Sequence, residues 1–423
     1  MLRMDNPESH AILQGMEFDS DILIIGGGLN GPALALALAD GGLSVTIIDA
    51  LPADARGDEG FDGRGYALAL ASQRLLAAVG VWNDVAAHSQ PIHEVKITDG
   101  RAGEGPSPWM LHFNSDELAE GPMGYMVEDR HLYRAFQSAL ARHPRITQIN
   151  GETVVSQTTG VAHASVQTAS GKVLTGRIVV GSDGRKSGTA QRAGIKRRGH
   201  DYNQTALVCA IEHDLPHHGI AHQFFMPPGP LAILPLTGNR ASIVWSEETA
   251  EAARINALSD ADYLAYLRPR FGSFLGEIRL AGARFTYPLN LTLANSFIAP
   301  RLALIGDAAH GVHPIAGQGL NLGLRDVGAL AEVLIMAKRR GEDIGAVDVL
   351  ERYQAWRGFD TTTLALATDG FNKLFSNDNS ILRAGRDIGL GIVNALPSLR
   401  QRFIREAAGL TGDVPKLLQG RQI

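Results

Sequence analysis

The sequence predicts an α/β protein in which a parallel sheet is interrupted by a mainly antiparallel sheet and followed by a helical C-terminal segment. Three stretches carry this prediction. Residues 21–49 show the strand–helix–strand pattern of a parallel βαβ unit. Residues 206–245 alternate short strands with loops, which is typical of antiparallel pairing. Residues 301–340 return to a buried strand followed by a helix, so we expect the first domain to resume after an insertion.

The N-terminal βαβ unit contains a glycine-rich loop between its first strand and its helix. Residues 21–25 form a short apolar run, which is typical of a strand buried on both faces of a parallel sheet. The loop at 26–31 follows, and Pro32 suits the first turn of a helix because that turn has no use for its missing N–H. A second strand at 44–48 then ends in Asp49.

The later elements divide the chain into three parts. Short strands are predicted at 93–98, 109–114 and 153–180, a turn leading into a helix at 64–82, and a further helix at 124–141. We expect the first domain to be discontinuous and to comprise residues 19–93, 124–197 and 284–346. The inserted sheet is assigned residues 94–123 and 198–283, and the C-terminal helical region residues 347–423.

Composition limits the classes of function. A chain of 423 residues with 45% hydrophobic residues, 20% charged residues and 48 glycines is typical of a packed α/β protein with many tight turns. A net charge of -5 gives no general attraction to phosphate backbones, so we expect no nucleic-acid partner. The single cysteine, Cys209, excludes an internal disulfide and a multi-cysteine metal site, which agrees with a reducing cytosol.

No membrane-spanning or secretory segment is predicted. Residues 1–20 lack a long apolar run and carry four acidic residues, and the apolar stretch at 32–39 is too short to cross a bilayer. Basic residues are interspersed with apolar ones near the C-terminus: Arg383, Arg386, Arg400, Arg402 and Arg405. We interpret them as a solvated face of a packing helix, with transient contact to an anionic membrane surface as the alternative.

The loop at 26–31 reads GGGLNG and matches the GxGxxG pattern, with the required strand before it and helix after it. Gly26 permits the tight turn, Gly28 lets a pyrophosphate approach the backbone, and Gly31 lets the helix pack closely on the strand. The loop amides and the positive end of the helix then bind the anion. Asp49 can accept hydrogen bonds from the adenosine ribose. An isolated match would be only a turn, but this context predicts a dinucleotide site.

Two further strands end in a glycine and an acidic residue. Asp183 and Gly184 follow the strand in RIVVGSDG, and taken alone this pair is more often only a turn. Gly306 and Asp307 follow the strand in RLALIGDAAH, where Asp307 can bind a polyol hydroxyl and the small residues after it leave room for a ligand.

These three motifs, in this order, resemble those of the single-component FAD-dependent aromatic hydroxylases with the p-hydroxybenzoate hydroxylase fold. HPIAGQGLNLGLRD, which begins at His313, resembles the signature of the ubiquinone-biosynthesis hydroxylases. The resemblance extends over nearly the whole chain, through RGYALALASQRLLAAVGVW, GYMVEDRHL, GPLAILPL, YPLNL and ATDGFNKLFSNDN. It implies a Rossmann-like FAD-binding domain of the glutathione-reductase type and an inserted substrate-binding sheet.

The resemblance gives the glycine-rich stretch after His313 a chemical role. Isoalloxazine is flat and becomes anionic at N1 when reduced, so the protein needs backbone N–H donors aimed at it. The expected cofactor contacts are Gly317, Gln318, Gly319, Leu320 and Asn321. The following helix contributes its positive end, worth about 0.3–1 kcal/mol. Pro314 stiffens the loop and presents a carbonyl toward the substrate, so Pro314, Gly317 and Gly319 are expected at the reacting centre. A connector without a ligand is the alternative.

Other cofactor contacts are implied by the resemblance alone. Arg64 and Arg130 would contact the flavin or its pyrophosphate, with a surface salt bridge as the alternative for each. Asp183 with Gly184 would serve both FAD and the incoming nicotinamide. Asp49 departs from the glutamate common in flavoproteins, which leaves the adenosine contact less defined.

The activity implied by the resemblance is hydroxylation of a polyprenylated phenol. NADPH or NADH reduces FAD, O2 forms a C4a-hydroperoxide on the flavin, and the phenol ring attacks its distal oxygen, so water must be excluded. Neither a metal nor a nucleophilic side chain is required. The alternatives are another aromatic hydroxylase, a halogenase or prenyl-chain reductase on the same scaffold, and a catalytically silent FAD-binding subunit. The halogenase is disfavoured because no Trp-x-Trp motif is present.

The candidate substrate residues lie in the inserted sheet: Phe224, Phe225, Leu234, Pro235 and Trp245. The alternative for such an apolar stripe is plain core. A histidine cluster comprises His213, His217, His218 and His222, and for it we favour no metal, because no cysteine or helical carboxylate–histidine framework accompanies it. His310 and His313 flank the flavin loop, where a structural hydrogen bond is preferred over a role in proton transfer.

The expected partner is therefore a polyprenyl phenol or a related small aromatic molecule. We expect a cytoplasmic protein, with a peripheral position at the inner face of the membrane or association with other ubiquinone-biosynthesis proteins as further possibilities.

Overall fold

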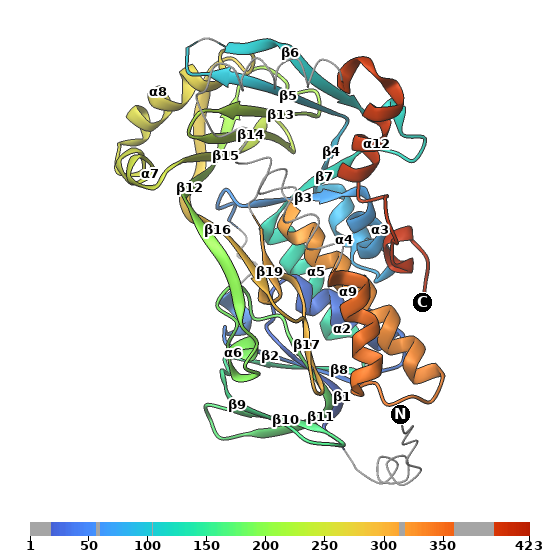
Figure 1. The fold of residues 1–423 in the computed structure, drawn as a ribbon. Helices are drawn as coiled ribbons and strands as arrows, with labels where there is room; N and C mark the ends of the chain where they lie inside the picture. Colours follow the sequence, from blue (N-terminus) through green and yellow to red (C-terminus); the bar gives the residue numbers. More distant parts are fainter. Residues whose placement is uncertain (1–17, 56–59, 104, 313–317, 359–392) are drawn as a thin grey trace.

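The structure, a computed structural model, describes residues 18–55, 60–103, 105–312, 318–358 and 393–423. Two large sheets form two ends of the molecule, and helices pack along one side of the first (Figure 1). The predicted α/β class is confirmed.

The first sheet has a parallel centre in the order β18–β11–β1–β2–β8. Its strands are short and apolar because both faces are covered. The parallel strands are β1 (Ser20–Ile25), β2 (Val45–Asp49), β8 (Ile146–Asn150), β11 (Val173–Gly181) and β18 (Leu302–Leu304). Antiparallel additions are β9 (Val154–Thr159), β10 (Ala164–Thr168) and β17 (Ile298–Ala299).

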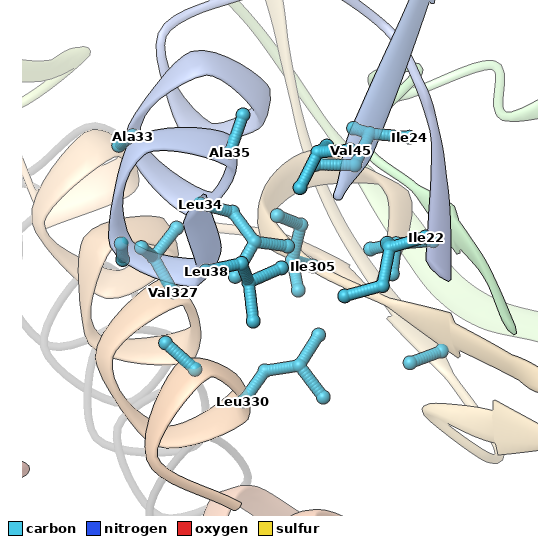
Figure 2. Close-up of a cluster of buried hydrophobic side chains, with 14 of the residues drawn as sticks. Ile22, Ile24, Ala33, Leu34, Ala35, Leu38, Val45, Ile305, Val327 and Leu330 are labelled. Carbon is cyan, nitrogen blue, oxygen red and sulfur yellow. The ribbon is translucent and has the colours of Figure 1, made fainter. Parts of the chain in front are cut away.

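Two helices that lie far apart in the sequence pack together against this sheet, α2 (Asn30–Asp40) and α9 (Gln318–Arg339). Figure 2 shows Leu34 and Leu38 of α2 pointing toward Ile22 of β1 and Ile305, with Leu330 of α9 nearby. All five side chains are fully buried. Burying a leucine or isoleucine contributes about 1.5–3 kcal/mol, so this contact holds the first βαβ unit against the resumed part of the domain.

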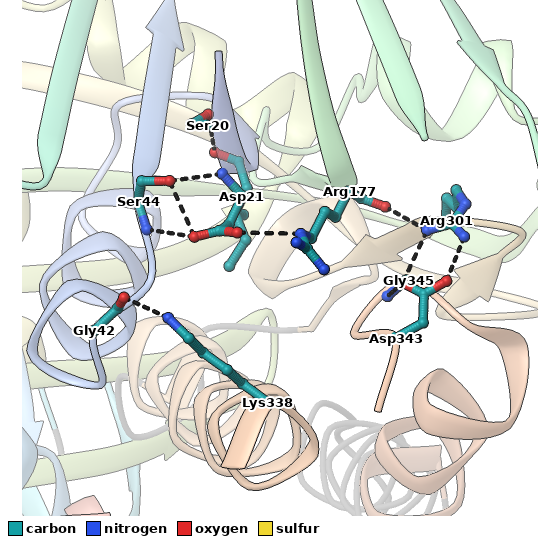
Figure 3. A network of polar contacts seen from close by, with 10 residues as sticks. Ser20, Asp21, Gly42, Ser44, Arg177, Arg301, Lys338, Asp343 and Gly345 are labelled. Carbon is teal, nitrogen blue, oxygen red and sulfur yellow. Dashed lines mark hydrogen bonds and ion pairs between the residues drawn. The ribbon is translucent and has the colours of Figure 1, made fainter. Parts of the chain in front are cut away.

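A polar network lies at the amino-terminal ends of the parallel strands (Figure 3). Asp21 accepts hydrogen bonds from the backbone N–H and hydroxyl of Ser44 at 2.9 and 3.0 Å, and it pairs with Arg177 at 3.2 Å. The buried Arg301 donates to the carbonyl of Arg177 at 3.0 Å and pairs with Asp343. Ligands of such sheets bind at the carboxyl ends of strands, so we interpret this network as structural.

The second sheet has eight strands in the order β19–β16–β12–β15–β14–β13–β5–β6. It is antiparallel except for the parallel pair β13–β5, which confirms the predicted mainly antiparallel insertion. Its strands are β5 (Glu94–Arg101), β6 (Gly105–Asn114), β12 (Arg197–His213), β13 (Ile220–Met226), β14 (Gly229–Leu236), β15 (Arg240–Glu248), β16 (Ile278–Ala294) and β19 (His310–Gly311). Helices α7 (Thr249–Asn256) and α8 (Asp260–Phe271) lie at this end of the molecule.

The two long strands β12 and β16 connect the two ends of the molecule (Figure 1). They pair from Arg197 with Ala294 to His213 with Ile278. The predicted limit between residues 283 and 284 falls inside β16, because one continuous strand serves both parts of the chain.

A small third sheet contains residues that the sequence predicts to be helical. It comprises β3 (Gly65–Ala69), β4 (Ser89–Ile92) and β7 (Gly124–Glu128), followed by α3 (Leu70–Ala78) and α5 (Asp129–Arg142). The sequence predicts helix from residue 124, which is wrong for the first five residues. A short apolar run fits a buried strand and a buried helix equally well until its pairing partner is known.

The described C-terminal part packs on both sheets. Residues 347–358 are helical, and α12 (Pro397–Ala407) buries Ile404 against the inserted sheet. Arg400 pairs with Glu117 at 2.9 Å and Arg405 with Glu120 at 2.8 Å. Arg383 and Arg386 lie outside the described residues. No helix in the described ranges is long and apolar enough to cross a membrane.

The described part of the chain also contains several short elements. They are η1 (Ala53–Ala55), α4 (Trp82–Val85), η2 (Ala86–His88), η3 (Ser115–Glu117), α6 (Gly188–Arg192), η4 (Gly306–Ala308) and η6 (Lys416–Gln419).

Candidate functional site

Three turns lie at the carboxyl ends of neighbouring parallel strands β1, β11 and β18, which is where ligands bind in sheets of this kind. The first two turns touch directly. The N–H of Ser182 donates to the carbonyl of Ile25 at 2.8 Å, and a Cβ on Gly26 would lie 2.3 Å from the Ser182 carbonyl oxygen. Gly26 also has a φ of +111°, so this close approach requires glycine.

The glycines of these turns fall into two groups. A Cβ on Gly31 would lie 2.1 Å from the Gly26 carbonyl oxygen, and one on Gly306 would lie 2.3 Å from Nδ2 of Asn30. These two positions are closed by the protein itself. In contrast, a Cβ on Gly28, Gly184 or Gly319 would meet no heavy atom within 4 Å among the described residues. This second group provides exposed backbone that a Cβ would cover, as the close approach of a pyrophosphate and a flat flavin requires.

Asn30, which the sequence analysis did not select, links two of the glycine turns to α9. Its side chain approaches Gly306, and a Cβ on Gly323 of α9 would lie 2.3 Å from its Nδ2. Its Oδ1 is buried without a hydrogen-bond partner in the described part of the chain. Such an atom is costly unless a ligand satisfies it. The sequence signal that could have identified Asn30 is an asparagine inside the GxGxxG motif, at the start of the helix.

Asp49 lies at the end of β2, facing the first glycine loop. It is 7% exposed, and its Oδ1 accepts a hydrogen bond from the N–H of Leu51 at 3.1 Å. A Cβ on Gly27 would lie 2.3 Å from its Oδ2, so the carboxylate directly adjoins the loop. A small cavity of about 10 Å³ opens here between Gly27, Asp49 and Asn150. This position fits the expected contact with the adenosine ribose.

The carboxylate of Asp183 is directed at α6. Its Oδ2 accepts from the N–H and hydroxyl of Thr189 at 2.9 and 2.8 Å, and its Oδ1 accepts from the hydroxyl of Ser187. Both oxygens therefore serve the start of α6, and side-chain contact with FAD or nicotinamide stays a prediction. What this turn offers a ligand is the open backbone at Gly184.

Asp307 lies in the third turn among cationic side chains. Its Oδ2 pairs with Nε of Arg185 at 3.0 Å, and both side chains are partly exposed. Arg197 donates to the backbone carbonyl of Asp307 at 2.8 Å, and burial lowers the pKa of Arg197. A hydroxyl ligand at Asp307 would share the carboxylate with Arg185.

A buried cluster of charged side chains binds the backbone of the third turn. Asp326 of α9 accepts from the N–H of Gly306 at 2.9 Å, lies 2.5 Å from Nε2 of His310 and accepts from Nε of Arg357 at 2.8 Å. The three side chains are at most 1% exposed. Burial alone would raise the pKa of Asp326, but His310 and Arg357 outweigh it and the pKa is lowered. His310 thus has a structural hydrogen bond, whereas His313 lies outside the described residues.

The first turn of α9 contains Gln318, Gly319, Leu320 and Asn321, and the N–H groups of a first helical turn have no partner within the helix. The Asn321 side chain, however, is held by β3 and α3. Its Oδ1 accepts from the N–H of Ala69 at 2.8 Å and from Ser72 at 2.7 Å, and its Nδ2 donates to Ala67 at 2.8 Å. These bonds fix the helix start. Pro314 and Gly317 lie outside the described residues.

The two arginines expected at the flavin make ion pairs within the protein. Arg64 pairs with Asp62 at 2.7 Å and with the buried Asp129 at 3.5 Å. Arg130 pairs at 2.8 Å with the buried Glu128, which also binds Arg240 at 2.6 Å. The salt-bridge alternative therefore describes their observed contacts, and flavin contact stays a prediction.

A cavity of about 160 Å³ lies between the small sheet and the inserted sheet. Apolar side chains form most of its wall, and Asn321 at the start of α9 belongs to it. Of the candidate substrate residues, Phe225 and Leu234 are in the wall. Ala407 of α12 is there too, so the C-terminal region helps to enclose the cavity.

Phe224, Pro235 and Trp245 are not in this wall. Phe224 and Trp245 are 3% and 1% exposed and belong to the core between the inserted sheet and α7–α8. Trp245 Nε1 donates to Glu247 at 2.9 Å. The prediction that Trp245 and Pro235 contact the substrate is therefore corrected. Alternate residues of a strand point to opposite faces, and composition does not tell which face borders the cavity.

Two of the clustered histidines contact carbonyl oxygens of loop and strand-end residues, whereas His222 lies in β13 and in the cavity wall. His213 Nδ1 lies 2.7 Å from the carbonyl oxygen of Leu215, and His217 Nε2 lies 2.8 Å from that of Leu236. Among the described residues, no group of three histidine, cysteine or acidic side chains is placed to hold a metal ion.

Comparison with known proteins gives the class first. Residues 19–358 match the family described as the FAD binding domain, a span that contains all three turns and the inserted sheet. The chain belongs to this family and is an FAD-dependent monooxygenase.

Its relatives identify the branch. The chain is 43% identical over 404 residues to ubiquinone hydroxylase UbiL of Rhodospirillum rubrum, covering 95% of this chain and 93% of that protein. It is 35% identical over 395 residues to 3-demethoxyubiquinol 3-hydroxylase of Escherichia coli, covering 92% and 99%. The chain therefore belongs to the ubiquinone-biosynthesis hydroxylases, and the resemblance seen in its motifs is confirmed.

Solved structures confirm the fold. p-Nitrophenol 4-monooxygenase PnpA of Pseudomonas putida matches with a TM-score of 0.78 and 19% identity, covering 94% of this chain and 100% of that one. PqsL of Pseudomonas aeruginosa matches with a TM-score of 0.73 and 23% identity, covering 88% and 99%.

Proposed function

We propose that this protein uses FAD, O2 and NADPH or NADH to hydroxylate the aromatic ring of a polyprenylated phenol. The observation that carries the proposal is the apolar cavity of about 160 Å³ that reaches Asn321, in the helical turn expected to face the flavin. The names of UbiL and 3-demethoxyubiquinol 3-hydroxylase support a substrate of the ubiquinone pathway.

FAD, when bound, supplies the redox chemistry with oxygen, and the chain supplies binding, orientation and exclusion of water. The open backbone at Gly28 would accommodate the pyrophosphate, and Asp49 the adenosine ribose. The N–H groups of the first turn of α9 would answer negative charge on the flavin ring. Phe225 and Leu234 would hold the substrate ring in a wall that excludes water.

The test is hydroxylation of a prenylated phenol by purified protein loaded with FAD. We expect oxidation of NADPH or NADH to accelerate when 2-geranylphenol is added, and one atom of isotope-labelled dioxygen to enter the ring. Mass spectrometry of the product measures this. Oxidation of NADPH that yields only hydrogen peroxide with every phenol tried would refute the proposal.

We also propose a peripheral contact with membrane lipid, because a polyprenyl tail partitions into the bilayer. Support comes from α12, which contributes Ala407 to the cavity wall while Phe403 and the preceding Leu396 are 38% and 48% exposed. Arg402 lies beside Phe403 and could meet anionic headgroups. Flotation with anionic vesicles should carry the protein upward, and Phe403→Ser should reduce the bound fraction. Equal flotation of the two proteins would remove α12 as the contact.

A further inference from the structure

The face of the inserted sheet that borders the cavity is apolar at nearly every position. Alternation along β13 places Ala221, Gln223 and Phe225 on this face, and all three are in the cavity wall. The neighbouring strand β5 pairs Val95 with Ala221 and Ile97 with Gln223, and both β5 residues are wall residues too. Gln223 is thus a polar side chain among mainly apolar ones, and its neighbour His222 is the other polar wall residue on β13.

The Nε2 group of the Gln223 amide is enclosed without a hydrogen-bond partner in the described part of the protein. Gln223 is 8% exposed, and its Nε2 is fully buried with no hydrogen-bond partner among the described residues. Leaving a buried N–H unpaired costs free energy that a leucine or methionine at this position would avoid. Folding alone therefore does not explain this residue.

A second glutamine in the same sheet shows the ordinary arrangement. Gln204 of β12 is 7% exposed, and its Nε2 donates to the carbonyl of Pro228 at 2.6 Å. The two glutamines are equally buried and differ in whether the amide has a partner. Gln223 is a wall residue of the cavity, and its Nε2 has no such carbonyl among the described residues.

We propose that Gln223 is a substrate-positioning residue whose Nε2 donates a hydrogen bond to an oxygen substituent on the aromatic ring. This inference rests on the proposed function, because it takes an aromatic substrate in this cavity as given. An N–H directed at a phenolic oxygen also favours the ionised phenol, which makes the ring carbons ortho and para to that oxygen more electron-rich. Gln223 thereby selects rings that carry oxygen over purely hydrocarbon rings and fixes which edge of the ring faces the flavin.

The test compares two ligands that differ by one oxygen, 2-geranylphenol and geranylbenzene, in the FAD-loaded protein. Dissociation constants come from the change in flavin absorbance on titration. The unaltered protein should bind the phenol about tenfold to a hundredfold more tightly, as expected for one buried hydrogen bond whose loss leaves a polar group unpaired. Gln223→Met should abolish this preference by weakening the phenol while leaving geranylbenzene unchanged or tighter.

The matched control is Gln204→Met, which removes an amide that already has a partner. It should lower the unfolding temperature and keep the preference for the phenol. Gln223→Met should keep or raise the unfolding temperature of the ligand-free protein, which a structural role would not allow. Gln223→Leu gives a second apolar variant with the same expectations.

The outcomes separate the two proposals. A Gln223→Met protein that still prefers the phenol, or that loses stability as Gln204→Met does, overturns the role of Gln223 while hydroxylation by the unaltered protein stands. Unaltered protein that binds neither ligand and hydroxylates no phenol overturns the proposed function and this inference with it.

Discussion

Substituting two glycines of the first loop separates the folding role of the loop from its role in cofactor binding. Gly28→Ala should fold normally and bind FAD weakly. Gly31→Ala should damage both folding and binding. The difference follows from what the new methyl group meets. At Gly28 it meets no heavy atom of the described residues within 4 Å, whereas at Gly31 it would lie 2.1 Å from the Gly26 carbonyl oxygen.

The size of each effect can be estimated from these distances. Cβ atoms essentially never approach closer than 3.0 Å, so Gly31→Ala requires the Gly26 backbone to retreat by about 0.9 Å, and overpacking of this kind costs about 1–3 kcal/mol of folding free energy. Gly28 has no positive φ, so alanine at this position should change stability by less than about 0.5 kcal/mol. The methyl group at position 28 would instead crowd the pyrophosphate. If this weakens the free energy of FAD binding by a similar amount, about 1–3 kcal/mol, the Kd for FAD rises about fivefold to over a hundredfold.

Two measurements check this prediction. Urea unfolding of the flavin-free proteins reports folding, and quenching of FAD fluorescence on titration reports the Kd. We expect Gly28→Ala to match the unaltered protein in the first assay and to differ in the second. Unchanged FAD affinity in Gly28→Ala would refute the inference that the pyrophosphate lies against this backbone.

Four further substitutions test the charge cluster, a partly buried histidine, the cavity wall and the neighbouring core. Asp326→Asn should lower the free energy of unfolding by about 3–5 kcal/mol, because it takes the carboxylate away from the buried Arg357; an unchanged urea midpoint would contradict this. Burial, with a smaller contribution from nearby charge, lowers the pKa of His222 to about 4, so the unfolded chain takes up a proton first as the pH falls. The contribution of His222 to the free energy of unfolding is then complete above about pH 6.5 and is lost toward pH 4, by up to about 3 kcal/mol. In His222→Phe, the free energy of unfolding should fall less between pH 7 and pH 5 than in the unaltered protein. Phe225→Ala should raise KM for 2-geranylphenol with little change in flavin content, whereas Trp245→Phe should lower the unfolding temperature and leave KM alone; the reverse pattern would place Trp245 in the site.

The parts of the site that could be predicted from sequence depend on short-range patterns. The strand, loop, helix and terminal acid of the first βαβ unit lie within 30 residues, so the spacing of Gly26, Gly31 and Asp49 already specifies their geometry. Gly306 and Asp307 are recognised similarly, because a buried strand directly precedes them. Such motifs also carry the resemblance to the family.

Other assignments needed the folded chain because they depend on partners far away in the sequence. The side chain of Asn321 is used by Ala69 and Ser72, about 250 residues earlier, a pairing that no local pattern indicates. The carboxylate of Asp183 was available to a ligand or to α6, and only the geometry of Thr189 shows that α6 takes it. A polar side chain has several possible partners, and proximity in three dimensions selects among them.

The sequence by itself determined the cofactor class and the α/β frame. A dinucleotide needs glycines where it approaches the backbone and an acidic residue at the end of the next strand, and both occur at a recognisable spacing. Tertiary structure alone decided which face of each inserted strand borders the cavity. A two-residue period gives a strand two faces and does not say which is inside. Phe225 lies on the cavity side and Trp245 in the opposite core for that reason, and the unpaired amide of Gln223 became visible only once the facing surfaces were in place.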